Sequence, residues 1–416
     1  MNETVPAKQK HVIVIGGGAS GMMAAITAAR IGAKVTILER NPRIGKKILA
    51  TGNGRCNYSN ITADISCYHG QNPRFAHSAL ANFDVQATLD FFEELGITPK
   101  IEERGKVFPM SEQASSVLDV LRYELEQTGV KVICEAYVRK IVKKDNTFLV
   151  TLDNSTEYRG DSVILAAGGK AMPASGSDGN AYELAENLGH SLTPIFPALV
   201  QLKLEGGFFK QIDGVKFVGT AEILHNNKIV ARDSGDILFA NYGVSGPPIL
   251  QISRKAGELL QKGREAVLKL IIFDKLTKEE LTKLLRKRFA LSPQKPLDFS
   301  LVGLINKRLI PVLLKEAGFT DLKRPAVSLS SKEQDKICNI LQDWRFPIRG
   351  TKSWPSAQVT AGGISTDEIN PHTMESKIVQ GLFFAGEIID IDGLCGGFNL
   401  QWAWSSGYLA GKNAAQ

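Results

Sequence analysis

The chain has 416 residues, which at about 150 residues per domain suggests two or three domains. Hydrophobic residues make up 43% and charged residues 22%, as in soluble globular proteins with a large core. The net charge of +7 is a mild basic excess. It is compatible with an anionic ligand, but by itself it does not indicate nucleic-acid binding, which we do not expect.

The cysteines and histidines argue against a disulfide framework or a metal centre. The five cysteines are widely spaced with no C-x-x-C pair, and the six histidines lack metal-ligand spacing. The first ten residues are polar and show no signal peptide, and glycines and Arg30 interrupt the apolar stretch 12–33. We therefore expect no metal, no membrane span and a cytoplasmic location.

The first predicted elements form a βαβ unit. Residues 11–15 are apolar and β-branched, and they predict a buried strand. A glycine turn, a helix over 20–31 and a strand over 34–38 follow. Further on we expect helices over 85–95 and 114–127, the second capped by Ser111. Strands are then expected over 131–136, 138–144, 148–152 and 162–167, and a helix over 180–188.

The sequence pattern changes after Pro194. Residues 199–240 alternate polar and apolar around Asn226-Asn227, which predicts an antiparallel hairpin. Capping boxes at Thr277–Glu280 and Ser330–Glu333 predict helices to about 289 and 341, and 298–317 is also helical in pattern. The apolar, glycine-rich pattern then returns from about 357. We infer one α/β domain from 1–192 and 356–416, interrupted by an insertion over 193–355 that has a helical part at about 277–325.

The strongest motif is a G-x-G-x-x-G over Gly16–Gly21 that follows a strand and opens a helix. Gly16 permits the tight turn, Gly18 lets the backbone approach a pyrophosphate, and Gly21 allows close packing. Ala19 and Ser20 complete the helix N-terminus, whose free N–H groups suit phosphates. Glu39 ends the next strand, where a carboxylate can bind a ribose hydroxyl.

The C-terminal part identifies the dinucleotide. An apolar strand ends in Gly386-Glu387, and a glycine-rich turn with Gly397, Asn399 and Leu400 precedes a helix over 402–411. Here the chain resembles the fumarate-reductase-like branch of two-dinucleotide-fold flavoproteins. The resemblance implies that Glu387 bonds the ribityl chain of FAD and that the helix N-terminus points at the flavin pyrimidine, where reduced flavin carries negative charge.

Four stretches narrow the resemblance: 43–57, 105–109, 238–247 and 359–364. They are similar to a bacterial family labelled NAD(FAD)-utilising dehydrogenase, aminoacetone oxidase or bile-acid reductase. The resemblance covers nearly the whole chain and implies an α/β fold, with a Rossmann-like FAD-binding domain interrupted by a β-barrel-like insertion that has a helical subdomain. Where members of the family often carry Thr-His, this chain has Ala240-Asn241.

The remaining candidate cofactor residues come from the segments that this resemblance covers or from positions beside the fingerprint. Cys56 lies among glycines, but a lone cysteine is more often a packed residue than a redox group. Arg55 can meet a phosphate, a substrate carbonyl or solvent. We assign the FAD site the further residues Arg40, Lys47, Gly52, Gly54, Arg55, Cys56, Asn57, Val138, Ala167 and Gly168.

These features predict an FAD-dependent oxidoreductase that transfers hydride between a small organic substrate and a non-covalent flavin. The substrate pocket is expected between the FAD domain and the insertion. Residues 166–179 lack a second dinucleotide fingerprint, so we expect NAD(P)H only as a transient reductant, or O2 as acceptor. The general acid or base and the direction of the reaction stay open.

Two alternatives remain. Some flavoproteins with this domain type modify tRNA, and the basic run over 283–288 could then contact RNA, although such a run is more often a solvated helix face. A non-enzymatic flavin sensor is the other alternative.

Overall fold

The structure, a computed structural model, describes residues 9–416, so most of the polar N-terminus in which we expect no signal peptide lies outside it. The chain forms two compact units. The discontinuous unit contains the residues up to Phe196 together with Gln358–Gln416, and the inserted unit is Pro197–Ala357.

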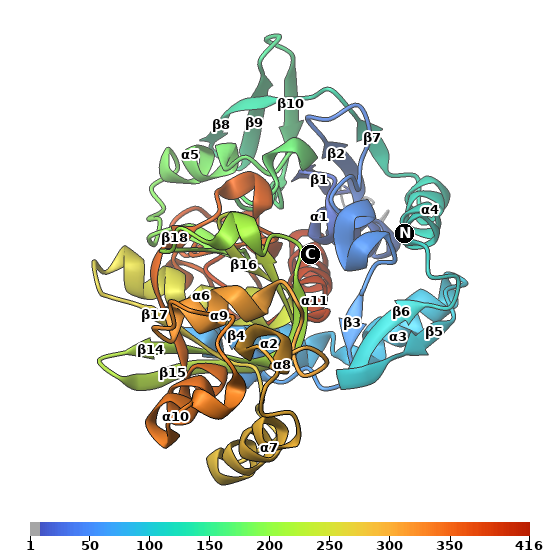
Figure 1. The fold of residues 1–416 in the computed structure, drawn as a ribbon. Helices are drawn as coiled ribbons and strands as arrows, with labels where there is room; N and C mark the ends of the chain where they lie inside the picture. Colours follow the sequence, from blue (N-terminus) through green and yellow to red (C-terminus); the bar gives the residue numbers. More distant parts are fainter. Residues whose placement is uncertain (1–8) are drawn as a thin grey trace, which may run out of the picture. The chain divides into compact units, whose positions relative to one another are not determined.

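The discontinuous unit is built on a five-stranded parallel sheet, ordered β20-β11-β1-β2-β7 (Figure 1). Ile15 pairs with both Leu38 and Leu165, and Leu165 pairs with Phe384. The carboxyl ends of four strands therefore meet along one edge, directly before Gly16, Glu39, the 166–169 turn and Gly386. The strands are β1 His11–Ile15, β2 Lys34–Leu38, β7 Lys131–Ile133, β11 Ser162–Leu165 and β20 Leu382–Phe384.

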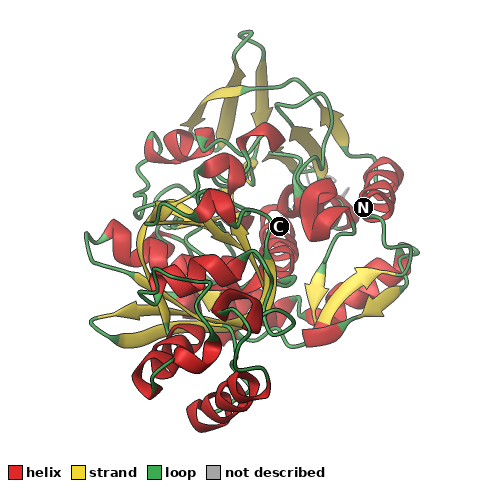
Figure 2. Ribbon diagram, in the orientation of Figure 1, coloured by secondary structure: helices red, strands yellow, loops and turns green. Residues whose placement is uncertain are grey.

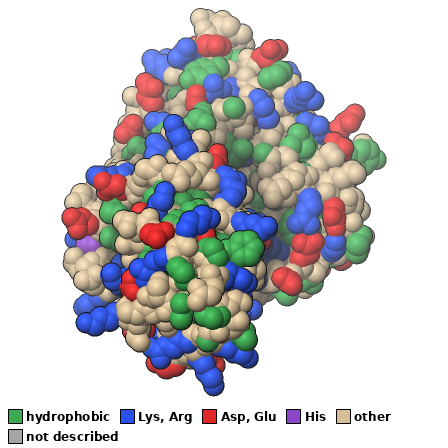
Figure 3. Space-filling model, viewed as in Figure 1, with side chains coloured by type: hydrophobic (Ala, Val, Ile, Leu, Met, Phe, Trp, Pro, Cys, Tyr) green, Lys and Arg blue, Asp and Glu red, His purple; other side chains and the backbone are tan. Residues whose placement is uncertain are grey.

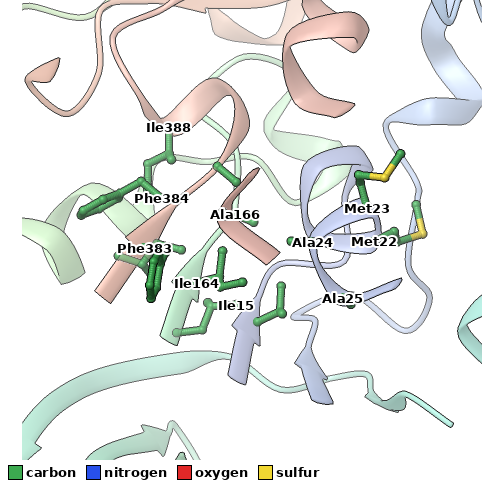
Figure 4. Packing of buried hydrophobic residues seen from close by; sticks show 14 of the residues in the cluster. Ile15, Met22, Met23, Ala24, Ala25, Ile164, Ala166, Phe383, Phe384 and Ile388 are labelled. Atoms are coloured by element: carbon green, nitrogen blue, oxygen red, sulfur yellow. The ribbon is translucent and has the colours of Figure 1, made fainter. Parts of the chain in front are cut away.

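Two helices from opposite ends of the sequence, α1 Ala19–Arg30 and α11 Phe398–Ala414, pack against each other. Figure 4 shows residues of α1 in the hydrophobic core beside Ile15, Ile164 and Phe384. The helices approach closely because α11 carries glycine at the contact. A Cβ at Gly407 would lie 2.5 Å from the Ser20 carbonyl oxygen, and one at Gly411 would lie 2.3 Å from that of Ala24.

Smaller elements complete the discontinuous unit. Ser111 does not cap α4 as expected: the N-cap is Gln113, and the Ser111 hydroxyl bonds that of Ser116. Helix α11 begins four residues before the expected position. The other elements are β3 Ser59–Asn60, β4 Tyr68–His69, α2 Ala76–Asn82, α3 Val85–Glu94, β5 Pro99–Ile101, β6 Lys106–Pro109, α4 Ala114–Gln127, β8 Val138–Lys144, β9 Thr147–Leu152, β10 Glu157–Gly160, α5 Asn180–Glu186, β19 Val359–Ala361 and β21 Asp392–Gly393.

The inserted unit contains a closed barrel, ordered β13-β16-β15-β14-β17-β18 (Figure 2). Asn226 and Asn227, with φ of 51° and 58°, form the turn of its longest hairpin, as the sequence predicts. The strands are β13 Leu202–Leu204, β14 Lys216–His225, β15 Lys228–Ala240, β16 Gly243–Ser245, β17 Val267–Ile271 and β18 Trp344–Thr351; β12 Phe196–Ala198 spans the boundary between the units.

The helices of the inserted unit lie between its barrel strands in the sequence. Both predicted capping boxes are present, at the starts of α7 and α10. The helical sequence expected over 298–317 forms two short helices, which the non-helical residues 301–308 separate. The helices are α6 Pro247–Gln261, α7 Lys278–Leu291, α8 Leu297–Ser300, α9 Leu309–Glu316 and α10 Ser331–Gln342.

The expected α/β class, with a Rossmann-like sheet, a barrel-containing insertion and a helical part, is confirmed. Among the helices of residues 9–416, none is both long and apolar enough to span a membrane.

We predict that Gly411→Ala destabilises the folded protein by about 1–3 kcal/mol, because the new methyl group would overlap the Ala24 backbone. The loss should exceed the gain in helix propensity that alanine brings. Gly207→Ala is the control, since no described atom lies within 4 Å of a Cβ there. Urea unfolding of the protein measures both, and equal stabilities for the two variants would contradict the prediction.

Candidate cofactor site

The glycines in the turn between β1 and α1 differ in how much space a Cβ atom would have. Gly16 has φ of 103°, and a Cβ on it would lie 2.6 Å from the Ala166 carbonyl oxygen. A Cβ on Gly21 would lie 1.9 Å from the Gly16 carbonyl oxygen. Gly18, the N-cap of α1, has no described atom within 4 Å of its Cβ position. The fold therefore requires Gly16 and Gly21, whereas Gly18 leaves space beside the helix N-terminus that a phosphate can occupy.

Glu39 is held beside this turn. Its side chain is buried, and Oε2 accepts the Gly17 N–H at 2.8 Å. Oε1 accepts the backbone N–H of Asn41 at 2.8 Å and its side-chain amide at 2.9 Å. Oε2 keeps acceptor capacity for a ribose hydroxyl. Asn41, which sequence reasoning missed, also donates to the Ser175 carbonyl and so links this carboxylate to a loop 134 residues away.

The Gly386-Glu387 turn is fixed by α11 and by Lys47. The Gly386 N–H donates to Ser406 Oγ at 2.9 Å, and Trp402 Nε1 donates to the Gly386 carbonyl at 3.1 Å. The Glu387 carboxylate accepts from Lys47 Nζ at 2.5 Å and from the Thr360 N–H at 2.9 Å. The structure thus joins two predicted site residues, Lys47 and Glu387, that are 340 residues apart in the sequence.

The N-terminus of α11 lies against residues 57–59, directly after the Gly54-Arg55-Cys56 stretch. Gly397 has φ of 102°, and a Cβ there would lie 2.1 Å from the Ser59 carbonyl oxygen and 2.9 Å from Asn57 Oδ1. No side chain within residues 9–416 caps this helix. The Asn399 side chain instead bonds both backbone groups of Gly393, so it shapes the glycine-rich turn.

Arg55 and Cys56 make contacts within the protein. The Arg55 guanidinium pairs with Glu102 at 2.9 Å and lies 4.0 Å from the centre of the Phe108 ring. The Cys56 side chain is fully buried, and burial raises the pKa of its thiol to about 12. A thiol in this state is not a nucleophile at neutral pH, which agrees with a packing role.

The remaining predicted residues lie in several different elements of the discontinuous unit. Gly168 has φ of 74°, and a Cβ there would lie 2.8 Å from Ser177 Oγ. Arg40 pairs with Asp178 and lies over the Tyr137 ring. Tyr137 is followed by Val138, which is buried at the start of β8. Gly52 and Gly54 have positive φ angles, 57° and 83°, in the kinked segment 48–54, while Ala167 and Leu400 are half-buried.

These groups fit FAD. The space at Gly18 suits the pyrophosphate, Glu39 suits the adenosine ribose, and the α11 N-terminus offers a second positive dipole end for the flavin. FAD is the cofactor that this site and its relatives indicate, and the contacts of each residue with it stay predictions. Within residues 9–416, no group of three or more His, Cys, Asp or Glu side chains could hold a metal ion.

This chain is similar to several known proteins. The HI0933-like protein Rossmann domain family matches residues 10–413. A 3-dehydro-bile acid delta(4,6)-reductase of Clostridium scindens is 40% identical over 97% of this chain and 98% of its own. A ribosomal RNA dihydrouridine synthase of Escherichia coli is 31% identical over 96% and 97%. Among solved structures, a 3-ketosteroid-delta4-(5alpha)-dehydrogenase of Rhodococcus jostii RHA1 is 17% identical over 100% and 98%, with a TM-score of 0.49.

We predict that Gly18→Ala and Gly21→Ala fail in different ways. Gly18→Ala should keep the stability of the FAD-free protein, because its Cβ meets open space, but should weaken FAD binding at least about tenfold by blocking the phosphates. Gly21→Ala should lower stability itself, because its Cβ overlaps the Gly16 backbone. Thermal unfolding without FAD and FAD titration separate the two effects. Unchanged FAD affinity in Gly18→Ala would place the pyrophosphate elsewhere.

We also predict that iodoacetamide at pH 8 does not modify Cys56 in the folded protein. With a pKa of about 12 the thiol stays protonated at this pH, and the reactive thiolate is nearly absent. Half-exposed Cys67 is the internal control and should react first. Peptide mass spectrometry after timed labelling provides the measurement. Labelling of Cys56 as fast as Cys67 would show that the thiol is activated.

Proposed function

The chain belongs to the HI0933-like family, and we propose that this FAD-dependent oxidoreductase reduces a carbon–carbon double bond conjugated to a carbonyl group. The observation that carries the proposal is the 40% identity to the bile-acid reductase along almost the whole of both chains. Such a match extends over the sheet, the glycine turn and the inserted unit alike.

The names of the two relatives support one shared chemistry. A 3-dehydro-delta(4,6) bile acid carries a ketone whose conjugation extends over two double bonds, and the relative is named as its reductase. A dihydrouridine synthase saturates a ring double bond of uridine that is conjugated to a carbonyl. Both reactions add a hydride to the carbon of the double bond that lies farther from the carbonyl group. A proton adds to the nearer carbon of the same double bond. Bound FAD, after reduction by a donor such as NAD(P)H, would supply the hydride.

The chain's own residues bind and orient the cofactor in this proposal. The helix N-terminus at Gly18 holds the pyrophosphate, and Glu39 holds the ribose. Glu387, oriented by Lys47 and Thr360, bonds the ribityl chain. The N-terminus of α11 stabilises the negative charge of the reduced flavin pyrimidine. We assign no residue as the proton donor.

We further propose that NAD(P)H is the transient reductant. The sequence has one dinucleotide fingerprint, which FAD occupies, so the nicotinamide and the substrate would use the same pocket in turn. Such an enzyme alternates between two half-reactions and shows ping-pong kinetics. A reducing cytoplasm suits the five cysteines, all of which are free thiols in the structure.

The charge distribution favours a second candidate substrate, uridine in ribosomal RNA. The inserted unit carries 27 Lys and Arg against 16 Asp and Glu, a net charge of +11, while the rest of the chain carries 23 against 27. Lys283, Arg286 and Lys287 are exposed on α7, and Figure 3 shows basic side chains over the end of the molecule that carries α7 and α10 in Figure 1. A basic surface of this kind attracts a phosphate backbone.

We predict that the dithionite-reduced holoenzyme transfers its hydride to a 3-oxo-4,6-diene steroid without oxygen. The flavin absorbance should return while the dienone absorbance falls, because a double bond is lost for each flavin oxidised. The saturated 3-oxo steroid is the matched control and should leave the flavin reduced. Anaerobic stopped-flow spectroscopy follows both bands.

The same reduced enzyme, mixed with an unmodified ribosomal RNA transcript, tests the second candidate. Flavin reoxidation with dihydrouridine in the RNA, and none with the dienone, would assign the chain to RNA. If neither acceptor nor any other conjugated carbonyl reoxidised the flavin, the proposed reaction would be wrong and a sensor role would gain support.

A further inference from the structure

Thr360 joins two segments of the candidate cofactor site, one through its hydroxyl group and the other through its backbone N–H. Thr360 lies in β19, directly after the chain returns from the inserted unit, and only 1% of its surface is exposed. Its Oγ1 accepts the N–H of Lys170 at 2.7 Å and that of Ala171 at 2.9 Å. Its own N–H donates to Glu387 Oε1 at 2.9 Å. The hydroxyl of Thr360 therefore holds the turn after β11, while the backbone N–H of the same residue holds Glu387 in the turn after β20.

The packing around Thr360 is tight. A Cβ on Gly169 would lie 2.4 Å from Thr360 Oγ1 and 2.9 Å from Glu387 Oε1. The glycine thus allows the 169–171 backbone to lie directly against both side chains. Because the hydroxyl is the partner of two amide groups in this crowded space, replacing it by a methyl group leaves buried donors unpaired.

Glu387 depends on this arrangement for its orientation. Lys47 Nζ holds Oε2, and the Thr360 N–H holds Oε1. Each carboxylate oxygen can still accept a bond from a ligand hydroxyl, so the two protein contacts aim the group without saturating it. A carboxylate that is already oriented loses less conformational freedom when a ligand binds.

We propose that Thr360 is a positioning residue of the FAD site, which orients the Glu387 carboxylate and the 169–171 turn before the cofactor binds. The proposal rests on FAD binding and is independent of the substrate. Thr360, which lies in the 359–364 stretch that carries the family resemblance, is thus part of the machinery that binds FAD, although it need not touch the cofactor.

The test compares FAD affinities of the apoprotein and its variants by flavin fluorescence titration. Thr360→Val should weaken FAD binding about ten- to a hundredfold, because the unpaired amide groups let the turn and Glu387 relax. Thr360→Ser, which keeps the hydroxyl, should stay within about threefold of the parent. Thr220→Val is the matched control: Thr220 is also fully buried, and its hydroxyl also has two partners, Ser234 and Asp274, in the inserted unit.

A double-mutant cycle separates an effect of Thr360 on the position of Glu387 from a general loss of structure in the FAD site. In a Glu387→Gln background, Thr360→Val should cost less FAD affinity than in the parent, because the 169–171 turn that the Thr360 hydroxyl holds packs against the Glu387 carboxylate. Circular-dichroism melting of the apoproteins checks folding, and Thr360→Cys, with a weaker acceptor, replaces Thr360→Val if the latter does not fold. Affinity within threefold of the parent for the folded Thr360 variant, an equal loss in Thr220→Val, or full additivity with Glu387→Gln would overturn the proposal.

Discussion

The contact of α1 with α11 is the constraint on which the rest of the site depends. Gly407 and Gly411 let the backbone of the C-terminal helix touch that of the N-terminal helix, and nothing larger fits. Because α11 is fixed there, its side chains Trp402 and Ser406 hold both backbone groups of Gly386. Its N-terminus is then set against Asn57 and Ser59. A helix–helix contact made of glycines thus determines where two halves of a cofactor site meet.

The sequence predicted the parts of this site that have a local pattern. Gly16, Gly18 and Gly21 lie within six residues between a strand and a helix, and that order is the signal itself. Glu39 and Glu387 each follow an apolar strand, so parallel-sheet geometry carries both to one edge. The resemblance to known flavoproteins supplied the barrel within the insertion, which alternation alone could not distinguish from an open sheet.

What the sequence could not predict depends on single contacts between distant segments. Asn41 and Thr360 each bond a segment more than a hundred residues away, and although Thr360 lies in the 359–364 stretch, the sequence does not indicate which partner either side chain has. The expected cap by Ser111 was wrong because the Ser111 hydroxyl bonds a second serine instead of the helix backbone. The start of α11 was placed late because glycines, which usually end helices, form its N-terminal turn.

The division of the chain has a consequence for its synthesis. The sheet needs β20, and α1 needs α11, so the discontinuous unit cannot close before residues 382–414 have left the ribosome. The inserted unit, in contrast, is a continuous segment with its own core and can fold while the nascent chain is still growing. Until then the side of α1 that packs against α11 is uncovered, and the incomplete chain exposes apolar surface there. A truncation within α11 would leave the protein in that state permanently.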